Sequence, residues 1–136
     1  MSPGRQIVVR PARILIVDDD DANREVLAII LAHEGFLTAA ADCGREALMA
    51  AAEQSPDLIL LDVMMPDMSG YEVAMKLKGD PSTRHIVICM ITALSDRATR
   101  LRALNAGADF FLSKPLDRGV LCAHVKSLLG NLVHAA

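Results

Sequence analysis

The amino-acid sequence predicts an α/β protein in which helices cover both faces of a doubly wound, five-stranded parallel sheet. Short runs rich in Ile, Val and Leu alternate five times with longer segments of helical period, which is the pattern of successive strand–helix units. The first, third and fourth runs are almost continuously hydrophobic, as strands buried on both faces are. Polar side chains follow four of the runs, at the edge where such a sheet holds its ligand site.

The five apolar runs are the expected strands. The second run is weak because it consists mostly of Ala, whereas the others combine Ile, Val, Leu or Phe. In order, the runs are Arg13 to Asp18, Phe36 to Ala41, Asp57 to Asp62, Ile86 to Thr92 and Ala108 to Ser113.

Five helical segments are expected between and after these strands. The first runs from about Ala22 to Glu34, and the third from about Ser69 to Gly79, each ending at or beside a glycine. Gly107 closes the fourth. The fifth has the clearest helical spacing, which predicts that one face packs on the sheet. The residues of that face are Leu121, Val125, Leu128 and Leu132.

We expect one domain, spanning residues 13–130. No repeat, low-complexity tract or linker interrupts this range, so residues 1–12 are interpreted as an N-terminal extension and residues 131–136 as a C-terminal tail. Cys43, Cys89 and Cys122 are far apart and form no CxxC pair, which favours buried or partly buried thiols over a metal site.

Composition excludes several classes of function. With 14 basic and 17 acidic residues the net charge is −3, and one Tyr, three Phe and no Trp leave little for bases to stack on, so no direct nucleic-acid binding is expected. The longest stretch without a charged residue, residues 85–95, is about half of the roughly 20 residues that a membrane span needs. Since the N-terminus also lacks a secretory signal, a cytoplasmic protein is expected.

Polar side chains converge at the carboxyl ends of the expected strands. Four consecutive aspartates, residues 18–21, follow the first strand, and Asp62 ends the third. Thr92 ends the fourth strand and Lys114 follows the fifth. Alone, each has an ordinary explanation, and Asp20 or Asp21 could simply cap the first helix. Together at one sheet edge they predict a site.

The residue types at this edge indicate the chemistry. Crowded carboxylates need a cation, and oxygen ligands without nearby Cys or His favour Mg²⁺, which commonly binds a phosphate as well. Lys114 would supply a charge to a phosphoryl oxygen, and Thr92 a hydroxyl donor. The sequence lacks a nucleotide-binding P-loop. A carboxylate can itself act as a nucleophile and carry the phosphoryl group.

Five stretches of the sequence carry a further signal through their order and spacing. They are ILIVDD (14–19), PDLILLDVMMPDMSGYE (56–72), MITA (90–93), AGAD (106–109) and KP (114–115). Together they resemble a receiver domain of two-component response regulators, from Arg13 to about Gly130. The resemblance implies the flavodoxin-like strand order 2-1-3-4-5, and a phosphoryl group taken from a phosphohistidine of a sensor histidine kinase or histidine phosphotransfer protein. It also implies a fused or separate output domain as a further partner.

The resemblance also implies a role for each matching position. Asp62 would be the phosphoacceptor, Thr92 and Phe111 the switch residues, and Lys114 the cation that contacts the phosphate, with a cis bond to Pro115. Output would pass through the face made by the fourth helix, fifth strand and fifth helix. Asp18, Asp19, Asp62 and the backbone carbonyl of Met64 would hold Mg²⁺.

Some positions depart from the family's commonest pattern. Phe111 replaces a frequent Tyr, and Val87 stands where the fourth strand often begins with Pro. Phe110 and His124 stand where many DNA-binding members carry Asp and Arg, which removes part of the salt-bridge set that those members use to dimerise.

Two residues flanking the acceptor suggest a long phosphate lifetime. In receivers, the positions two after the acceptor and two after the switch hydroxyl overhang the approach of the hydrolytic water. Here they are Met64 and Leu94, both bulky and unable to orient a water by hydrogen bonding. Slow self-dephosphorylation is therefore expected.

Three alternatives remain open. Asp18-x-Asp20 after an apolar strand mimics a haloacid-dehalogenase-like phosphatase, although Ala22 stands where that family has Thr or Val. A flavodoxin-type carrier would share the fold, but the chain lacks the Ser/Thr-rich phosphate loop and flanking aromatics that hold a flavin. The third alternative is a receiver-like binding module that is not phosphorylated.

Overall fold

The fold is a single parallel sheet, as predicted. The computed structural model describes residues 10–93 and 96–134. All strand pairs are parallel and the strand order is β2-β1-β3-β4-β5, so the predicted topology is confirmed. The strands are β1 (Arg13–Val17), β2 (Leu37–Ala41), β3 (Leu58–Asp62), β4 (Val87–Thr92) and β5 (Phe110–Ser113).

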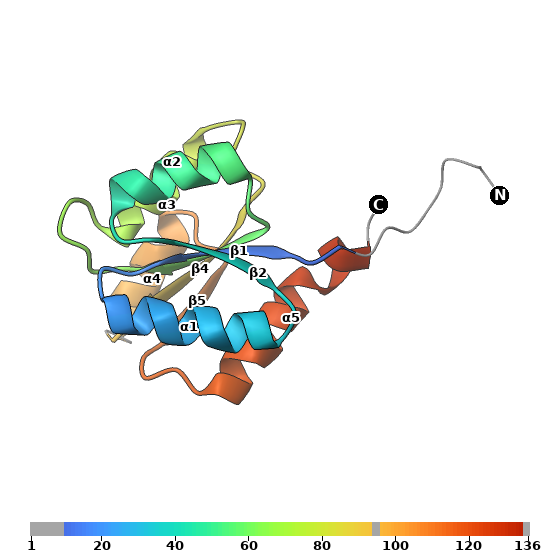
Figure 1. The fold of residues 1–136 in the computed structure, drawn as a ribbon. Helices are drawn as coiled ribbons and strands as arrows, with labels where there is room; N and C mark the ends of the chain where they lie inside the picture. The colour runs from blue at the N-terminus through green and yellow to red at the C-terminus, as the bar shows by residue number, and fades with distance from the viewer. Residues whose placement is uncertain (1–9, 94–95, 135–136) are drawn as a thin grey trace.

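Helices cover both faces of the sheet (Figure 1). Buried residues of α2, α3 and the end of α4 pack on one face, and those of α1 and α5 on the other. Gly35 and Gly107 follow α1 and α4 with φ of 93° and 105°, a conformation that glycine adopts without steric cost. The helices are α1 (Asp21–His33), α2 (Gly44–Gln54), α3 (Gly70–Gly79), α4 (Arg97–Asn105) and α5 (Arg118–His134).

The central strands feed two hydrophobic cores by alternation. In β1, Leu15 and Val17 pack toward α2 and α3, whereas Ile14 and Ile16 pack toward α1 and α5. Every residue of β3 is buried, and β4 is buried except at its first residue. The continuous hydrophobicity of these strands therefore reports burial on both faces, as expected. The Ala-rich β2 is an edge strand and is only partly covered.

The inner face of α5 largely follows the predicted spacing. Leu121 and Val125 are buried as expected, but Leu129 is fully buried whereas Leu128 is only half-buried. Leu132 lies outside the residues whose side chains are described.

The three cysteines are free thiols, two of them buried, and burial raises the pKa of Cys89 to about 12. In the described part of the chain, no helix is long and apolar enough to span a membrane.

The domain's contacts begin before β1. Arg10 donates two hydrogen bonds to the carboxylate of Asp57, at 2.7 and 2.8 Å, and the backbone N–H of Arg13 donates to the same carboxylate. Ala12 is buried in the core. The segment that precedes β1 is therefore fixed against the start of β3.

Lys78 ties three segments together at the amino-end side of the sheet. Its Nζ donates to the backbone carbonyls of Arg84 and Ile86, at 3.1 and 2.8 Å, and to the carboxylate of Asp109 at 2.9 Å. Asp109 in turn accepts from the backbone N–H of Ile88. One side chain at the end of α3 thus fixes the entry into β4 and into β5.

We predict that Lys78→Met lowers the free energy of unfolding by about 1–3 kcal/mol, because two carbonyls and a carboxylate lose a charged donor. Urea unfolding of both proteins at pH 7 measures the change. Lys76→Met is the matched control, since Lys76 is an exposed residue of the same helix. Equal losses in the two variants would show that the Lys78 contacts contribute nothing specific.

Candidate functional site

Two buried aspartates lie side by side at the carboxyl edge of the sheet. Val17 and Leu61 are register partners in neighbouring parallel strands, so Asp18 and Asp62, which follow them, lie at the same height. Asp18 is 3% and Asp62 is 7% exposed. Oxygen atoms of Asp18, Asp62 and the exposed Asp19 all lie within 4.8 Å of one another. The three predicted carboxylates therefore form one cluster.

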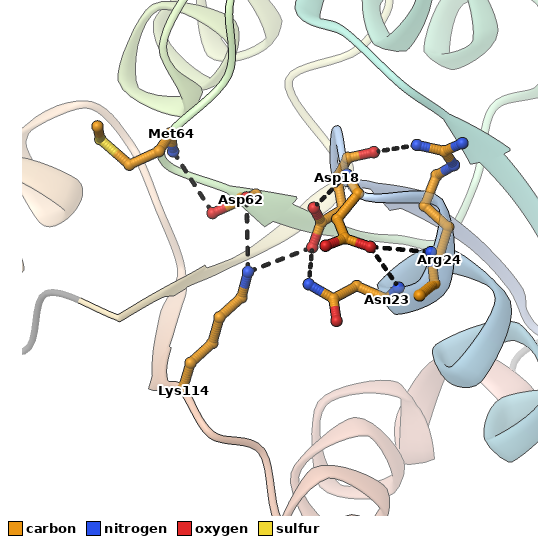
Figure 2. A network of polar contacts seen from close by, with 8 residues as sticks. Asp18, Asn23, Arg24, Asp62, Met64 and Lys114 are labelled. Atoms are coloured by element: carbon orange, nitrogen blue, oxygen red, sulfur yellow. Dashed lines mark hydrogen bonds and ion pairs between the residues drawn. The ribbon is translucent and has the colours of Figure 1, made fainter.

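Lys114 bridges the two buried carboxylates. Its Nζ lies 3.2 Å from Oδ2 of Asp18 and 3.5 Å from Oδ2 of Asp62. Figure 2 shows the ammonium between the two carboxylates. The backbone N–H of Lys114 donates to the carbonyl of Thr92 at 2.8 Å, which fixes the start of the β5–α5 loop. The bond between Lys114 and Pro115 is cis, as the resemblance implies.

The loop after β1 holds Asp18 in place. Oδ1 of Asp18 accepts a hydrogen bond from the backbone N–H of Asp20 at 2.9 Å, and Oδ2 of Asp18 accepts one from Nδ2 of Asn23 at 3.4 Å. Asp20 caps α1 by accepting the backbone N–H groups of Ala22 and Asn23. This confirms the capping explanation for Asp20 and leaves Asp18 and Asp19 to face the cluster.

Asp62 is supported from the other side by the loop that leads to α3. The backbone N–H of Met64 donates to Oδ1 of Asp62 at 3.4 Å, and the N–H of Gly70 donates to the carbonyl of Val63 at 2.9 Å. A Cβ at Gly70 would lie 2.4 Å from the carbonyl oxygen of Asp62. Only glycine permits this close approach of α3 to the end of β3.

The cluster raises the pKa of Asp62. Burial is the main cause, the charge of Asp18 adds to it, and the Lys114 ammonium opposes it. For Lys114, burial lowers the pKa, but the charges of Asp62 and Asp18 outweigh burial and raise it overall. Lys114 therefore stays protonated, and one ammonium faces more negative charge than it neutralises.

Two further predicted residues, Thr92 and Met64, line the same cavity, whose volume is about 430 Å³. Thr92 is buried at the end of β4, and Met64 is 64% exposed at the rim. The residues that line the cavity are Asp18, Asp19, Asp20, Asn23, Asp62, Met64, Thr92, Ala93 and Lys114. Leu94, the second predicted lifetime residue, lies outside the described residues.

The two phenylalanines of β5 point to opposite faces of the sheet. Phe111, the predicted switch aromatic, is half-buried against the core of α2 and α3 and is not among the residues lining the cavity. Phe110 packs on the opposite core and contacts the ring of His124 in α5, with centroids 4.7 Å apart. Phe110 is therefore the phenylalanine that reaches α5.

The residues present fit a hard divalent cation. The cluster consists of three carboxylates, of which Asp18 and Asp62 are buried, and the ammonium of Lys114 lies between these two. Oxygen ligands of this kind suit Mg²⁺. The excess negative charge beside Lys114 is the electrostatic reason for this cluster to bind a divalent cation.

Sequence reasoning missed three supporting residues. Asn23 and Arg24 of the first turns of α1 both reach back to Asp18, the latter through the backbone carbonyl. Asp67, in the loop before α3, accepts the backbone N–H groups of Gly44 and Arg45 at 2.9 Å and so caps α2. Helix geometry could have placed Asn23 beside Asp18, but the cap by Asp67 is a contact between distant segments.

We predict that Asp62→Asn stabilises the ion-free protein at neutral pH. The folded state raises the pKa of Asp62 above the unfolded value of about 3.9, so the wild type carries a penalty for ionising it. That penalty is absent below about pH 3.9, grows until the folded pKa is passed, and is constant above it. Urea unfolding between pH 4 and 8, with a chelator present, measures the difference.

Asp80→Asn is the control of opposite sign. Hydrogen bonds from the backbone and hydroxyl of Ser82 lower the pKa of Asp80, so this variant should lose stability at neutral pH. An Asp62→Asn variant that also loses stability at pH 7 would contradict the electrostatic account of the cluster.

Comparisons with known proteins identify the family. Residues 14–126 match the model of the response regulator receiver domain. The chain is 50% identical over 117 residues to the response regulator PleD of Caulobacter vibrioides, covering 86% of this chain and 26% of PleD. It is 42% identical to the DNA-binding response regulator MtrA of Mycolicibacterium paratuberculosis, covering 86% of this chain and 51% of MtrA. The chain thus spans about a quarter to a half of these relatives.

Solved structures agree with the sequence matches. The receiver domain of a signal transduction histidine kinase from Syntrophus aciditrophicus superposes with a TM-score of 0.83 at 42% identity, covering 89% of this chain and 92% of that one. The chemotaxis response regulator CheY4 of Vibrio cholerae gives 0.84 at 28% identity, covering 88% and 100%. With the carboxylate cluster at the carboxyl edge of a 2-1-3-4-5 sheet, these matches show that the chain belongs to the response regulator receiver family.

Proposed function

We propose that Asp62 is the residue that receives the phosphoryl group in this receiver domain. The observation that carries the proposal is its position: a buried carboxylate at the end of β3, with Asp18 and Asp19 on one side and Lys114 in contact. Burial is the main cause of the raised pKa of Asp62, the charge of Asp18 adds to it, and Lys114 offsets only part of the rise. A divalent cation that accompanies the phosphoryl group would offset the remaining negative charge.

The proposed transfer is an exchange of one bond to phosphorus for another. A carboxylate oxygen of Asp62 attacks the phosphorus of a phosphohistidine, an O–P bond forms, and the N–P bond breaks with its electron pair returning to the imidazole. Lys114, already in contact with Asp62, would neutralise a phosphoryl oxygen. Thr92 lines the same cavity and would supply a hydroxyl donor.

Four groups would hold Mg²⁺. They are the carboxylates of Asp18, Asp19 and Asp62, which cluster in the structure, and the backbone carbonyl of Met64 at the rim. A bound Mg²⁺ supplies charge neutralisation for the oxygens of the transferring group. Lys114 would then be released from Asp18 to face the phosphoryl group.

The partner that donates the phosphoryl group is proposed to be a sensor histidine kinase or a histidine phosphotransfer protein. An apolar cleft of about 470 Å³ adjoins the acidic cavity and shares Asp18, Asn23 and Lys114 with it. Val26 and Ile30 of α1 line this cleft, and Val26 is 55% exposed. A partner helix seated there would lie beside the acceptor.

We propose that output passes through α4, β5 and α5. The support is that α4 buries no large apolar side chain: its buried residues are Thr99 and Ala103, and its Leu101 and Leu104 are exposed. The guanidinium of Arg102 lies 4.3 Å from the ring centre of Tyr71, a contact that holds α4 to α3. In this proposal Thr92 and Phe111 respond to the phosphoryl group and shift the population of two arrangements of this face.

Other aspects of the proposal rest on the family and the composition. The receiver domain is proposed to span residues 13–130, to act as a phosphoacceptor that assists its own phosphotransfer and dephosphorylation, and to work in the cytoplasm. A fused or separate output domain is proposed because PleD and MtrA are much longer than this chain. Any nucleic-acid contact would then belong to that output domain.

We predict that wild-type protein incubated with Mg²⁺ and a small acyl phosphate gains one phosphoryl group of acyl-phosphate stability, and that Asp62→Asn gains none. Intact-mass spectrometry measures the incorporation. Without a divalent cation, incorporation should fall by at least tenfold, because the carboxylates then repel the incoming anion.

Asp80→Asn is the matched control, since Asp80 is exposed and its carboxylate accepts hydrogen bonds from Ser82 in the loop after α3. Equal incorporation into wild type and Asp62→Asn would contradict the assignment of the acceptor. Absence of any phosphorylated wild type would favour a binding module that is not phosphorylated.

We further predict that the acyl phosphate is long-lived and that Met64→Asn shortens its life. The side chain of Met64 is 64% exposed at the rim of the cavity and cannot orient a water, whereas an amide can. With Leu94→Glu added, decay should accelerate about tenfold, equivalent to about 1.4 kcal/mol of barrier. A decay time course after removal of the phosphodonor measures both variants.

Met75→Asn is the control for replacing an exposed Met by Asn elsewhere. Met75 lies on α3, is about as exposed as Met64 and does not line the cavity. Its phosphate should decay at the wild-type rate. Unchanged or slower decay in the Met64 and Leu94 variants would mean that other residues set the lifetime.

A further inference from the structure

Arg24 is a partly buried cation beside the carboxylate cluster. Its side chain is only 17% exposed, although it carries a charge and lies in the first turns of α1. Nη1 donates to the backbone carbonyl of Asp18 at 2.7 Å, and Nη2 forms an ion pair with the carboxylate of Asp21. Figure 2 shows the guanidinium reaching back from α1 to the end of β1.

The carbonyl that Arg24 binds belongs to the peptide between Asp18 and Asp19. A peptide group is planar, so fixing its oxygen fixes the direction in which the chain enters Asp19. The N–H of Asp18 donates to the carbonyl of Ala41 at 3.2 Å, which ties the preceding peptide to β2. The two contacts together set the backbone on both sides of Asp18.

The two cations at the site act on different atoms. Lys114 contacts the carboxylate oxygens that an ion would take, so it must yield them when the ion binds. Arg24 contacts a carbonyl and Asp21, and neither belongs to the proposed ion ligands. Its contacts can therefore persist with the ion bound.

We propose that Arg24 is a positioning residue for Mg²⁺ binding: it holds the peptide between Asp18 and Asp19 so that both carboxylates face the ion before the ion arrives. The inference rests on the proposed function, because it concerns the same site. The inference gives Arg24 a geometric role in the loop after β1, in addition to the effect of its charge.

Charge and geometry predict opposite effects of removing Arg24. As a positive charge, Arg24 repels a divalent cation, so its loss should strengthen Mg²⁺ binding. As a positioning residue, it pre-organises the ligands, so its loss should weaken binding. Loss of groups that orient metal ligands typically costs about 10–100-fold in affinity, which exceeds the effect of one screened charge.

The test is a titration with MgCl₂ alone, at constant ionic strength and without phosphodonor, followed by amide NMR shifts of the loop after β1 and of residues 62–64. We expect Arg24→Gln to weaken Mg²⁺ binding about tenfold. Arg24→Lys keeps the charge, but an ammonium cannot bind the carbonyl and Asp21 together as the planar guanidinium does. Its Mg²⁺ affinity should therefore lie between those of the wild type and Arg24→Gln. The Lys variant therefore isolates geometry even where the Gln variant folds poorly.

Titration with Ca²⁺ separates positioning from general destabilisation. Ca²⁺ accepts irregular ligand arrangements, whereas Mg²⁺ demands a near-octahedral one. Loss of pre-organisation should therefore weaken Mg²⁺ more than Ca²⁺. Arg45→Gln is the matched control, because it removes an exposed arginine from the first turn of α2, and it should leave Mg²⁺ affinity unchanged or slightly higher.

Equal or tighter Mg²⁺ binding by Arg24→Gln would overturn the inference, as would equal weakening toward both ions. In either case, Mg²⁺ binding by the wild type would leave the proposed function standing. A wild type whose amides around Asp18 and Asp62 do not respond to Mg²⁺ would contradict the proposed function and this inference together.

Discussion

The mutual repulsion of three carboxylates at one buried sheet edge is the constraint on which this site depends. Asp18 and Asp62 are almost fully buried, Asp19 adjoins them, and Lys114 is shared between the buried pair. Burial of like charges is costly unless cations are supplied. The raised pKa of Asp62 records the part of that cost which Lys114 leaves uncompensated. A site in this condition favours the binding of a divalent cation, which would then offset the charge of an incoming phosphoryl group.

The sheet makes this crowding possible because its strands are held by forces unrelated to the site. β1 and β3 are buried on both faces by aliphatic side chains, and their register places Asp18 beside Asp62. Gly70 lets α3 approach the carbonyl of Asp62 more closely than any other residue could. The hydrophobic cores thus supply the free energy that holds the carboxylates together.

Most of the fold and the cluster could be predicted because their signals are local. Apolar runs with polar ends locate both the strands and the residues that leave them, so Asp18, Asp62, Thr92 and Lys114 could be assigned to one edge. The contacts of Arg24 with Asp18 and of Asp67 with α2 could not, because arginine and aspartate are common on exposed helices and in loops, and nothing in the sequence marks the carbonyl or amide that they bind. The same holds for α5, where Leu129 replaces Leu128 as the innermost residue through packing that spacing alone does not resolve.

The two sides of the site differ in how tightly they are packed. The side of Asp62 is fixed by buried strands, by Gly70 and by the contacts of Asp18. In contrast, α4 leaves its large apolar residues Leu101 and Leu104 exposed and is held to α3 by the contact of Arg102 with Tyr71. A phosphoryl group can shift a conformational equilibrium only by the difference in its contacts between two states. In the proposed mechanism, a few hydrogen bonds from Thr92 and Lys114 would supply only a few kcal/mol, so the element that responds would have to be weakly attached. α4 meets this requirement, because the two residues that it buries, Thr99 and Ala103, present no large apolar side chain to the core.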